Sequence, residues 1–129
     1  MKNFKEKVAV ITGAGSGMGR YLAVLLAKDG ADVCVCDVNE ETLNETVAML
    51  RKYNVSVSSH LLDVSDKASI EALPQKVIDQ HGKVDLVFNN AGVGCGSYFK
   101  DLDEDHWDRV MSINFEGVIN STRAFLPYM

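Results

Sequence analysis

Proline and clusters of positive charge are scarce in this sequence, and each scarcity excludes a class of protein. With two prolines in 129 residues, 24% charged residues and 47% hydrophobic residues, the chain is neither collagen-like nor disordered. Lys and Arg number 13 against 18 Asp and Glu, and without a basic cluster this acidic balance argues against a nucleic-acid partner. Residues 1–129 are therefore expected to form one ordinary domain, long enough to bury a real core.

Cysteine is also sparse, and long apolar runs are absent. Three cysteines, Cys34, Cys36 and Cys95, are too few for a disulfide framework and suit a reducing compartment, so a cytoplasmic location is expected. Cys34 and Cys36 alternate with valines, which favours two small buried side chains on one strand face, and no metal site is expected. The longest apolar run, residues 21–27, is too short to span a membrane, so no membrane partner is expected.

Apolar runs and helical spacing alternate along the chain. The runs predict four strands, over residues 8–11, 33–36, 55–58 and 84–88. The first two are continuous apolar runs, typical of strands covered on both faces, whereas residues 55–58 alternate apolar and polar, which indicates a half-buried strand near a sheet edge. Helical crossovers between such strands imply an α/β fold with a doubly wound parallel sheet, helices on both faces and right-handed connections.

Four stretches with helical spacing follow the strands. The first begins at Gly17, the second is capped by Asn39, the third is capped by Ser65 and ends at Gly82, and a long fourth runs from about residue 102 to the C-terminus. The residues predicted to face inward are Met18, Leu22, Leu25 and Leu26 in the first, Leu43, Val47 and Leu50 in the second, and Ile70, Leu73 and Val77 in the third.

A glycine-rich turn follows the first predicted strand and opens the first helix. Glycine there permits a tight turn, close backbone approach to a ligand and close packing of helix on strand. The free N–H groups and the dipole of the first helical turn favour a pyrophosphate. A glycine-rich turn alone is weak evidence for a bound ligand. The alternative interpretation is therefore a turn that binds no ligand. The candidate cofactor-binding residues are Thr12, Gly13, Gly15, Ser16, Gly17, Met18 and Gly19.

Asp37 ends the second predicted strand, where a carboxylate can accept hydrogen bonds from the two ribose hydroxyls of an adenosine. The same carboxylate would repel a 2′-phosphate, and neither Ser16 nor the neighbouring Val38 supplies a positive charge to receive one. Asp37 and Val38 are therefore candidate cofactor residues, with NAD expected in preference to NADP. The alternative is that Asp37 is a surface turn residue before Asn39.

Asn114 lies in the apolar stripe of the last predicted helix. Trp107, Met111, Val118 and Phe125 fall nearly in line with it on a helical wheel. An amide in an apolar stripe costs about 1 to 3 kcal/mol unless it is hydrogen-bonded. The Asn114 side chain therefore either forms a structural hydrogen bond to a helix neighbour or belongs to a functional site.

The glycine turn and three further motifs of the chain resemble those of the short-chain dehydrogenases/reductases. The spacing from Gly13 through Gly17 to Gly19 is similar to that family's cofactor turn. Asp63 and Val64 resemble the pair after the third strand, whose aspartate bonds the adenine amino group and whose neighbour lies along the ring. Residues 89–92, Asn-Asn-Ala-Gly, resemble the motif that steadies the sheet and lines the cofactor, which makes Asn90, Ala91 and Gly92 candidates.

The resemblance extends to Asn114, which matches the asparagine of the family's catalytic tetrad. There it interrupts the helix and positions a water and the catalytic lysine. The resemblance implies a Rossmann-type fold with strand order 3-2-1-4 in this part, a long C-terminal helix and a homo-oligomer. It also implies an NAD-dependent oxidoreductase that transfers hydride between the nicotinamide and a small-molecule alcohol or carbonyl substrate.

The sequence departs from the family in one large respect. The family's chemistry needs a serine after a fifth strand and a Tyr-x-x-x-Lys, and no tyrosine here has a lysine four positions later. We therefore expect a truncated, cofactor-binding part that is inactive alone. Without a fifth strand, residues 84–88 form a sheet edge that favours self-association or low stability.

Two other functions are alternatives to this expectation. One is a non-catalytic module that binds NAD or another protein without the rest of the family's fold. The other is an S-adenosylmethionine-dependent methyltransferase, which shares a glycine turn and an acidic residue after the second strand. The motif at residues 89–92 and Asn114 count against the methyltransferase.

Overall fold

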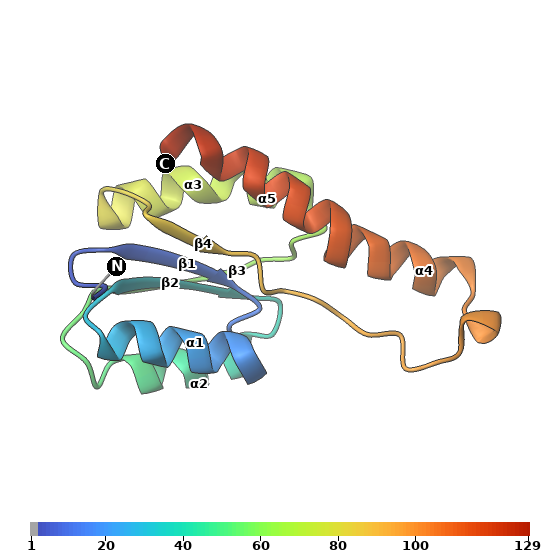
Figure 1. The fold of residues 1–129 in the computed structure, drawn as a ribbon, viewed down its shortest axis with the longest axis horizontal. Helices are drawn as coiled ribbons and strands as arrows, with labels where there is room; N and C mark the ends of the chain where they lie inside the picture. Colours follow the sequence, from blue (N-terminus) through green and yellow to red (C-terminus); the bar gives the residue numbers. More distant parts are fainter. Residues whose placement is uncertain (1–2) are drawn as a thin grey trace.

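The computed structural model describes residues 3–129, so residues 1–2 of the predicted domain lie outside it. Within that range, four parallel strands form one sheet in the order β3-β2-β1-β4 (Figure 1). The strands are β1 (Val8–Thr12), β2 (Asp32–Asp37), β3 (Val57–Leu61) and β4 (Leu86–Phe88). The order and the parallel α/β architecture confirm the predicted Rossmann-type fold.

Helices cover both faces of the sheet (Figure 1). α1 (Gly17–Lys28) and α2 (Glu40–Leu50) lie on one face, and α3 (Lys67–His81) and α5 (Gly117–Phe125) lie on the other. Successive side chains of a strand point to opposite faces, so Ala9 and Ile11 of β1 join one buried cluster while Val8 and Val10 join the other. The apolar strand runs are therefore buried from both sides, as predicted.

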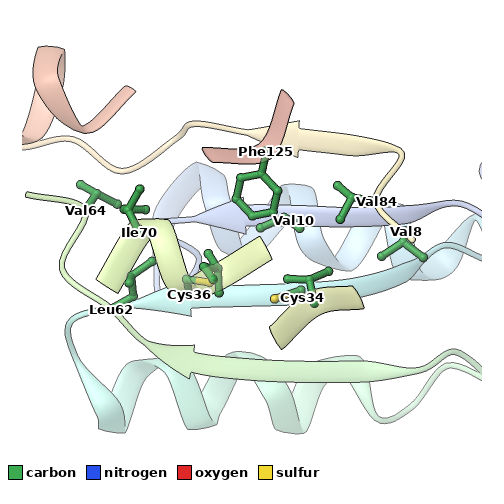
Figure 2. Packing of buried hydrophobic residues seen from close by; sticks show 11 residues of the cluster. Val8, Val10, Cys34, Cys36, Leu62, Val64, Ile70, Val84 and Phe125 are labelled. Atoms are coloured by element: carbon green, nitrogen blue, oxygen red, sulfur yellow. The ribbon is translucent and has the colours of Figure 1, made fainter. Parts of the chain in front are cut away.

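The cluster under α3 and α5 includes both cysteines of β2. Figure 2 shows Cys34 and Cys36 on the same side of β2, the side on which Ile70 of α3 and Phe125 of α5 also lie. Both cysteines are buried and neither forms a disulfide, whereas Cys95 is exposed. The prediction of two small buried side chains on one strand face is confirmed.

The bounds of all four strands differ from the prediction. β1 ends one residue later, β2 is one residue longer at each end, and β3 and β4 each begin two residues later. β3 begins at Val57 rather than at residue 55 because its pairing with β2 starts at Val33 opposite Val57 and ends at Asp37 opposite Leu61. The alternating run alone does not show where that pairing begins. One β3 residue, Ser58, is buried, which fits the predicted half-buried edge strand. β4 begins at Leu86 rather than at residue 84, because its pairing with β1 covers three residues.

Two helix starts test the predicted caps. Asn39 caps α2 as predicted, and its side-chain oxygen accepts the Thr42 N–H at 3.0 Å. Ser65 does not cap α3, because its hydroxyl donates to the Asp63 carboxylate at 2.6 Å and the N-cap position passes to Asp66.

The inward face of α1 was predicted wrongly at two positions. Met18 is 81% exposed and Leu25 is 41% exposed, whereas the buried residues of the helix include Ala23 and Ala27. Small side chains on that face let α1 lie close to the sheet, so the larger ones point away from it.

The C-terminal helical stretch is long, as predicted, but it is not a regular α-helix throughout. α4 (Glu104–Met111) continues into a π-helical segment (Ser112–Glu116) and then into α5. In this segment the Gly117 N–H reaches back five residues to the Ser112 carbonyl. Phe125 is buried as the apolar stripe predicts, but Trp107 is 46% exposed and no residue of α4 is buried.

Within residues 3–129, no helix combines the length and the apolar character needed to cross a bilayer.

Candidate functional site

A cleft of about 630 Å³ opens where the carboxyl ends of the strands meet α4 and the π-helical segment. Loops at this end of a doubly wound sheet are the usual place for a ligand. Predicted site residues on its walls are Thr12, Gly13, Ser16, Met18, Asp37, Val38, Asp63, Val64, Asn90, Ala91 and Gly92. Gly15, Gly17, Gly19 and Asn114 are not among the residues that line it.

Two glycines of the turn after β1 are required by close packing. Gly13 has a positive φ of 66°, and a Cβ atom there would lie 2.8 Å from the Cα of Ala91. A Cβ on Gly19 would collide with the Gly13 carbonyl oxygen. The turn is therefore pressed against the loop after β4, and Gly19 acts in that packing rather than on the cleft surface.

Thr12 and Asn90 join the same two segments by hydrogen bonds. The Thr12 hydroxyl oxygen accepts the backbone N–H groups of Asn90 and Ala91, each at 3.1 Å. The Asn90 side chain donates to the carbonyl oxygens of Thr12 and Gly13, at 3.1 and 3.2 Å. Each segment thus holds the other, so the chain's own hydrogen bonds tie β1 to the loop after β4 at the cleft.

Asp37 lies on the cleft wall and also bonds the glycine turn. One carboxylate oxygen accepts the Gly15 N–H at 2.9 Å, and the other accepts the Asn39 N–H at 3.1 Å. An ionised carboxylate has about four lone-pair sites, so these bonds leave acceptor capacity for a ligand. Asp37 therefore combines the two alternatives from the sequence, because it bonds the turn before α2 and also faces the cleft.

Asp63 and Val64 form another part of the wall, beyond the end of β3. One oxygen of the Asp63 carboxylate accepts both the backbone N–H and the hydroxyl of Ser65, at 2.9 and 2.6 Å. This local turn holds the carboxylate in place beside the cleft. Val64 is buried and belongs to the core cluster under α3 and α5.

Asn114 lies in the π-helical segment, at the interruption of the helix that the resemblance implied. Its side-chain oxygen accepts the Val93 N–H and its side-chain nitrogen donates to the Val93 carbonyl, both at 2.8 Å. The amide thus bonds the loop after β4 rather than a helix neighbour. Val93, Ser112 and Ile113 line the cleft, so Asn114 holds part of its wall from behind.

The charged residues on the cleft wall are Asp37, Asp63 and Arg109. Cys36, the residue before Asp37 in β2, also lines the cleft. The neighbouring Cys34 thiol, burial and the charge of Asp37 raise the pKa of the Cys36 thiol. Two carboxylates and one guanidinium therefore set the charge of the wall.

The sequence analysis did not predict some residues of the site. Arg109, Ser112 and Ile113 reach the cleft from α4 and the π-helical segment, which the sequence placed only as helix. Arg20 follows the last glycine of the turn directly, and its guanidinium bonds the turn from the side of α2. The position of Arg20 next to the motif was a signal that sequence reasoning could have used.

The family model for short chain dehydrogenases matches residues 7–129. This chain belongs to the short-chain dehydrogenase family. The match covers almost every residue that the structure describes, including all of the predicted site motifs. As a member of that family, the chain belongs to a family of oxidoreductases.

Individual relatives of this short-chain dehydrogenase agree with the assignment. A short chain dehydrogenase/reductase from Burkholderia phymatum, solved in complex with NAD, is 42% identical with a TM-score of 0.94, over 100% of this chain and 46% of that one. Carveol dehydrogenase from Mycobacterium avium, also with NAD, is 28% identical with a TM-score of 0.91, over 99% of this chain and 51% of that one. The 3-oxoacyl-(acyl-carrier-protein) reductase FabG of Thermotoga maritima is 35% identical, over 95% of this chain and 50% of that protein.

All of these relatives are longer than this chain. The short-chain dehydrogenase chain spans between 21% and 55% of the length of the curated relatives that it matches. The similarity therefore concerns the part of the family fold that carries the sheet order β3-β2-β1-β4 and the cleft at its carboxyl edge.

Proposed function

We propose that this short-chain dehydrogenase chain binds NAD in the cleft, in support of hydride transfer between a nicotinamide and an alcohol or carbonyl substrate. The observation that carries the proposal is the Asp37 carboxylate, which lies on the cleft wall and accepts the Gly15 N–H of the glycine turn. A carboxylate in that place matches the ribose hydroxyls of an adenosine and opposes a 2′-phosphate. NAD is therefore preferred to NADP.

The residues at the cleft fit a dinucleotide part by part. The turn and the N-terminus of α1 would receive the pyrophosphate, because backbone N–H groups and the helix dipole attract anions. Asp37 and Val38 would hold the adenosine ribose, Asp63 and Val64 the adenine, and residues 90–92 the part of the cofactor beyond the pyrophosphate. The turn residues in this proposal are Thr12, Gly13, Gly15, Ser16, Gly17, Met18 and Gly19.

The close packing of the turn supports this assignment. Gly13 and Gly19 leave no room for a side chain, so the turn packs directly against the loop after β4 at the cleft. Two relatives solved with NAD, from Burkholderia phymatum and Mycobacterium avium, have the same backbone arrangement over nearly the whole chain. A bound nicotinamide would supply the hydride chemistry, and these residues would bind and orient the cofactor.

We also propose that the 129 residues bind the cofactor without turning over an alcohol. None of the four tyrosines has a lysine four positions later, so the proton donor that the family resemblance implies is not in this sequence. The contribution of Asn114 would then be to hold the Val93 loop at the cleft, through the two bonds of 2.8 Å described above.

The test is a titration of the purified chain with NADH and, in parallel, with NADPH. The only tryptophan, Trp107, lies on α4 together with the cleft residue Arg109, so energy transfer from the indole to a bound reduced nicotinamide gives the signal. Saturable binding that favours NADH is expected. Absence of saturable binding of both cofactors would overturn the proposal.

A double variant sharpens the choice between the two cofactors. Asp37→Ser with Val38→Arg removes the carboxylate and adds a cation at the cleft wall, so the ratio of NADPH affinity to NADH affinity should rise. An unchanged ratio would remove Asp37 from its proposed role. Arg123→Ser, an exposed change on α5 away from the cleft walls, is the control.

A further inference from the structure

The guanidinium of Arg20 bonds the glycine turn from the side of α2, away from the cleft. One terminal nitrogen, Nη2, donates to the Gly15 carbonyl, to the Thr42 carbonyl at 3.0 Å and to the Glu45 carboxylate at 2.9 Å. Its Nε donates to the Thr46 hydroxyl at 2.9 Å. The side chain of Arg20 is 25% exposed, so most of it is packed between the turn and α2.

Thr46 extends this contact to the preceding peptide of the turn. Its side chain is fully buried, and its hydroxyl donates to the Ala14 carbonyl at 2.8 Å while accepting from Arg20. Two successive carbonyls, those of Ala14 and Gly15, are therefore held by side chains on α1 and α2. We call Arg20 and Thr46 together the carbonyl clamp.

Holding a carbonyl also decides where the N–H of the same peptide points. In a trans peptide the C=O and the N–H point in opposite directions, and residues 3–129 contain no cis peptide. Because Thr46 holds the Ala14 carbonyl, the Gly15 N–H of that peptide is directed to the other side, where it meets the Asp37 carboxylate at 2.9 Å. Arg20 acts in the same way on the next peptide and directs the Ser16 N–H away from α2.

The space around Gly15 is too small for a side chain. A Cβ atom there would lie 2.7 Å from the Thr42 hydroxyl and 2.9 Å from the Asp37 carboxylate. At Gly15 the turn is thus closely packed against both Thr42 of α2 and Asp37. A shift of the turn would therefore move the carboxylate or break its bond to Gly15.

We propose that the carbonyl clamp positions Asp37, so that Arg20 is a positioning residue for recognition of the adenosine ribose although it does not line the cleft. This inference rests on the proposed NAD site. Arginine suits the role because its planar fork donates to several acceptors at once, whereas the compact lysine ammonium cannot span the same set. The ion pair with Glu45, whose side chain is 55% exposed, is secondary.

The first experiment compares NADH binding to the wild-type chain and to Arg20→Met, by energy transfer from Trp107. We expect about a tenfold loss of NADH affinity, the size typical of losing charge-assisted hydrogen bonds that hold a ligand group. Arg20→Lys keeps the charge but not the fork, and a loss between those of the wild type and Arg20→Met is expected. It also serves if Arg20→Met does not fold.

Two matched controls separate the clamp from general effects of charge. Arg51→Met removes an exposed arginine just after α2, and NADH affinity should not change. Glu45→Gln neutralises the partner of Arg20 but leaves its bonds to the turn, so affinity should again be unchanged. A loss with Glu45→Gln equal to that with Arg20→Met would assign the effect to the ion pair and overturn the clamp.

A double-mutant cycle with Asp37→Ala tests whether Arg20 acts through Asp37. If it does, Arg20→Met on the Asp37→Ala background should lower NADH affinity by no more than about twofold, because the group being positioned is already gone. An equal loss on both backgrounds would mean that Arg20 supports the turn in general, and would overturn the inference while the NAD site stands. Failure of the wild-type chain to bind NADH would instead overturn the proposed function itself.

Discussion

β1 and β4 are adjacent strands of one sheet and both are apolar, yet they differ in burial. All five residues of β1 are buried, whereas all three of β4 are only partly buried. β1 pairs with β2 on one edge and with β4 on the other, and within residues 3–129 β4 pairs with β1 alone. The difference therefore comes from neighbours in space and not from the hydrophobicity of the two strands.

The same difference separates the two sides of the cleft. The side built on β1 and β2 is held by the bonds of Thr12, Asp37 and the carbonyl clamp. The side built on α4 has no buried residue on that helix, and its Trp107 is 46% exposed. Side chains without packing partners have more freedom to move, so the β1 side is expected to keep its geometry better than the α4 side.

The largest expected effect comes from a matched pair of valines. Val10 of β1 lies opposite Val87 of β4 in the ladder, and Val10 is completely buried whereas Val87 is not. Val10→Ala should lower the free energy of unfolding by about 2 to 3 kcal/mol, because two buried methyl groups are lost and a cavity remains. Val87→Ala should cost about half as much. Urea unfolding of both variants measures the difference, and equal losses would contradict the burial argument.

A smaller effect is expected where the two strands are tied by side chains. Thr12→Val keeps the shape of the side chain but leaves the N–H groups of Asn90 and Ala91 without their acceptor, at a cost of about 1 to 2 kcal/mol in unfolding free energy. Thr122→Val is the comparison, because the Thr122 hydroxyl donates to the Val118 carbonyl and accepts from the Asn89 side chain at exposed positions, where water can replace both bonds. Equal stability of Thr12→Val and the wild type would show that the bonds are replaced by water.

The smallest effect concerns Asp85, which precedes β4 and bonds the start of β1. Partial burial raises the pKa of Asp85. The Val8 N–H, the Lys83 ammonium and Lys7 lower this pKa by more, so it lies below the ordinary value of 3.8. Because the pKa is lower in the folded state than in the unfolded state, the charged carboxylate stabilises the fold at pH values above 3.8. This contribution is lost as the pH falls through the folded pKa.

Asp85→Asn should therefore lower the free energy of unfolding by about 0.5 kcal/mol at pH 7, a typical value for an ion pair whose lysines are exposed to solvent. The difference from the wild type should shrink below about pH 4. Urea unfolding between pH 3 and pH 7 measures it, with Asp101→Asn as an exposed control. A difference that grows on acidification would have the wrong sign for this explanation.

Much of the fold was predictable because local patterns and tertiary packing agree. The continuous apolar runs become buried strands, Asn39 caps α2, and the parallel pairing follows from the helical crossovers, whereas the strand order came from the family resemblance. The failures occur where a residue has two local options. Ser65 is a good cap by type, but its hydroxyl bonds Asp63 instead. Met18 and Leu25 are apolar at helical spacing, yet alanines take the inner face of α1.

The candidate site divides in the same way. The glycine turn, Asp37, Asp63 and residues 90–92 were readable as motifs, and the structure places most of them on the cleft wall. Their roles with a cofactor remain predictions. Only the position of Arg20 beside the turn was readable from the sequence. Its partners Thr42, Glu45 and Thr46 were not, because they lie on a different helix and no local pattern pairs them with Arg20.

The sequence by itself determined the alternation of strands and helices and the residue types at the ends of the strands. Hydrophobic periodicity and glycine spacing are local properties, and they act before the chain is folded. Only the tertiary structure decided which apolar residues are buried, which carbonyl each side chain holds and that Asn114 bonds Val93. Those outcomes depend on contacts between segments far apart in the chain, where space and hydrogen-bond geometry select among options that the sequence leaves open.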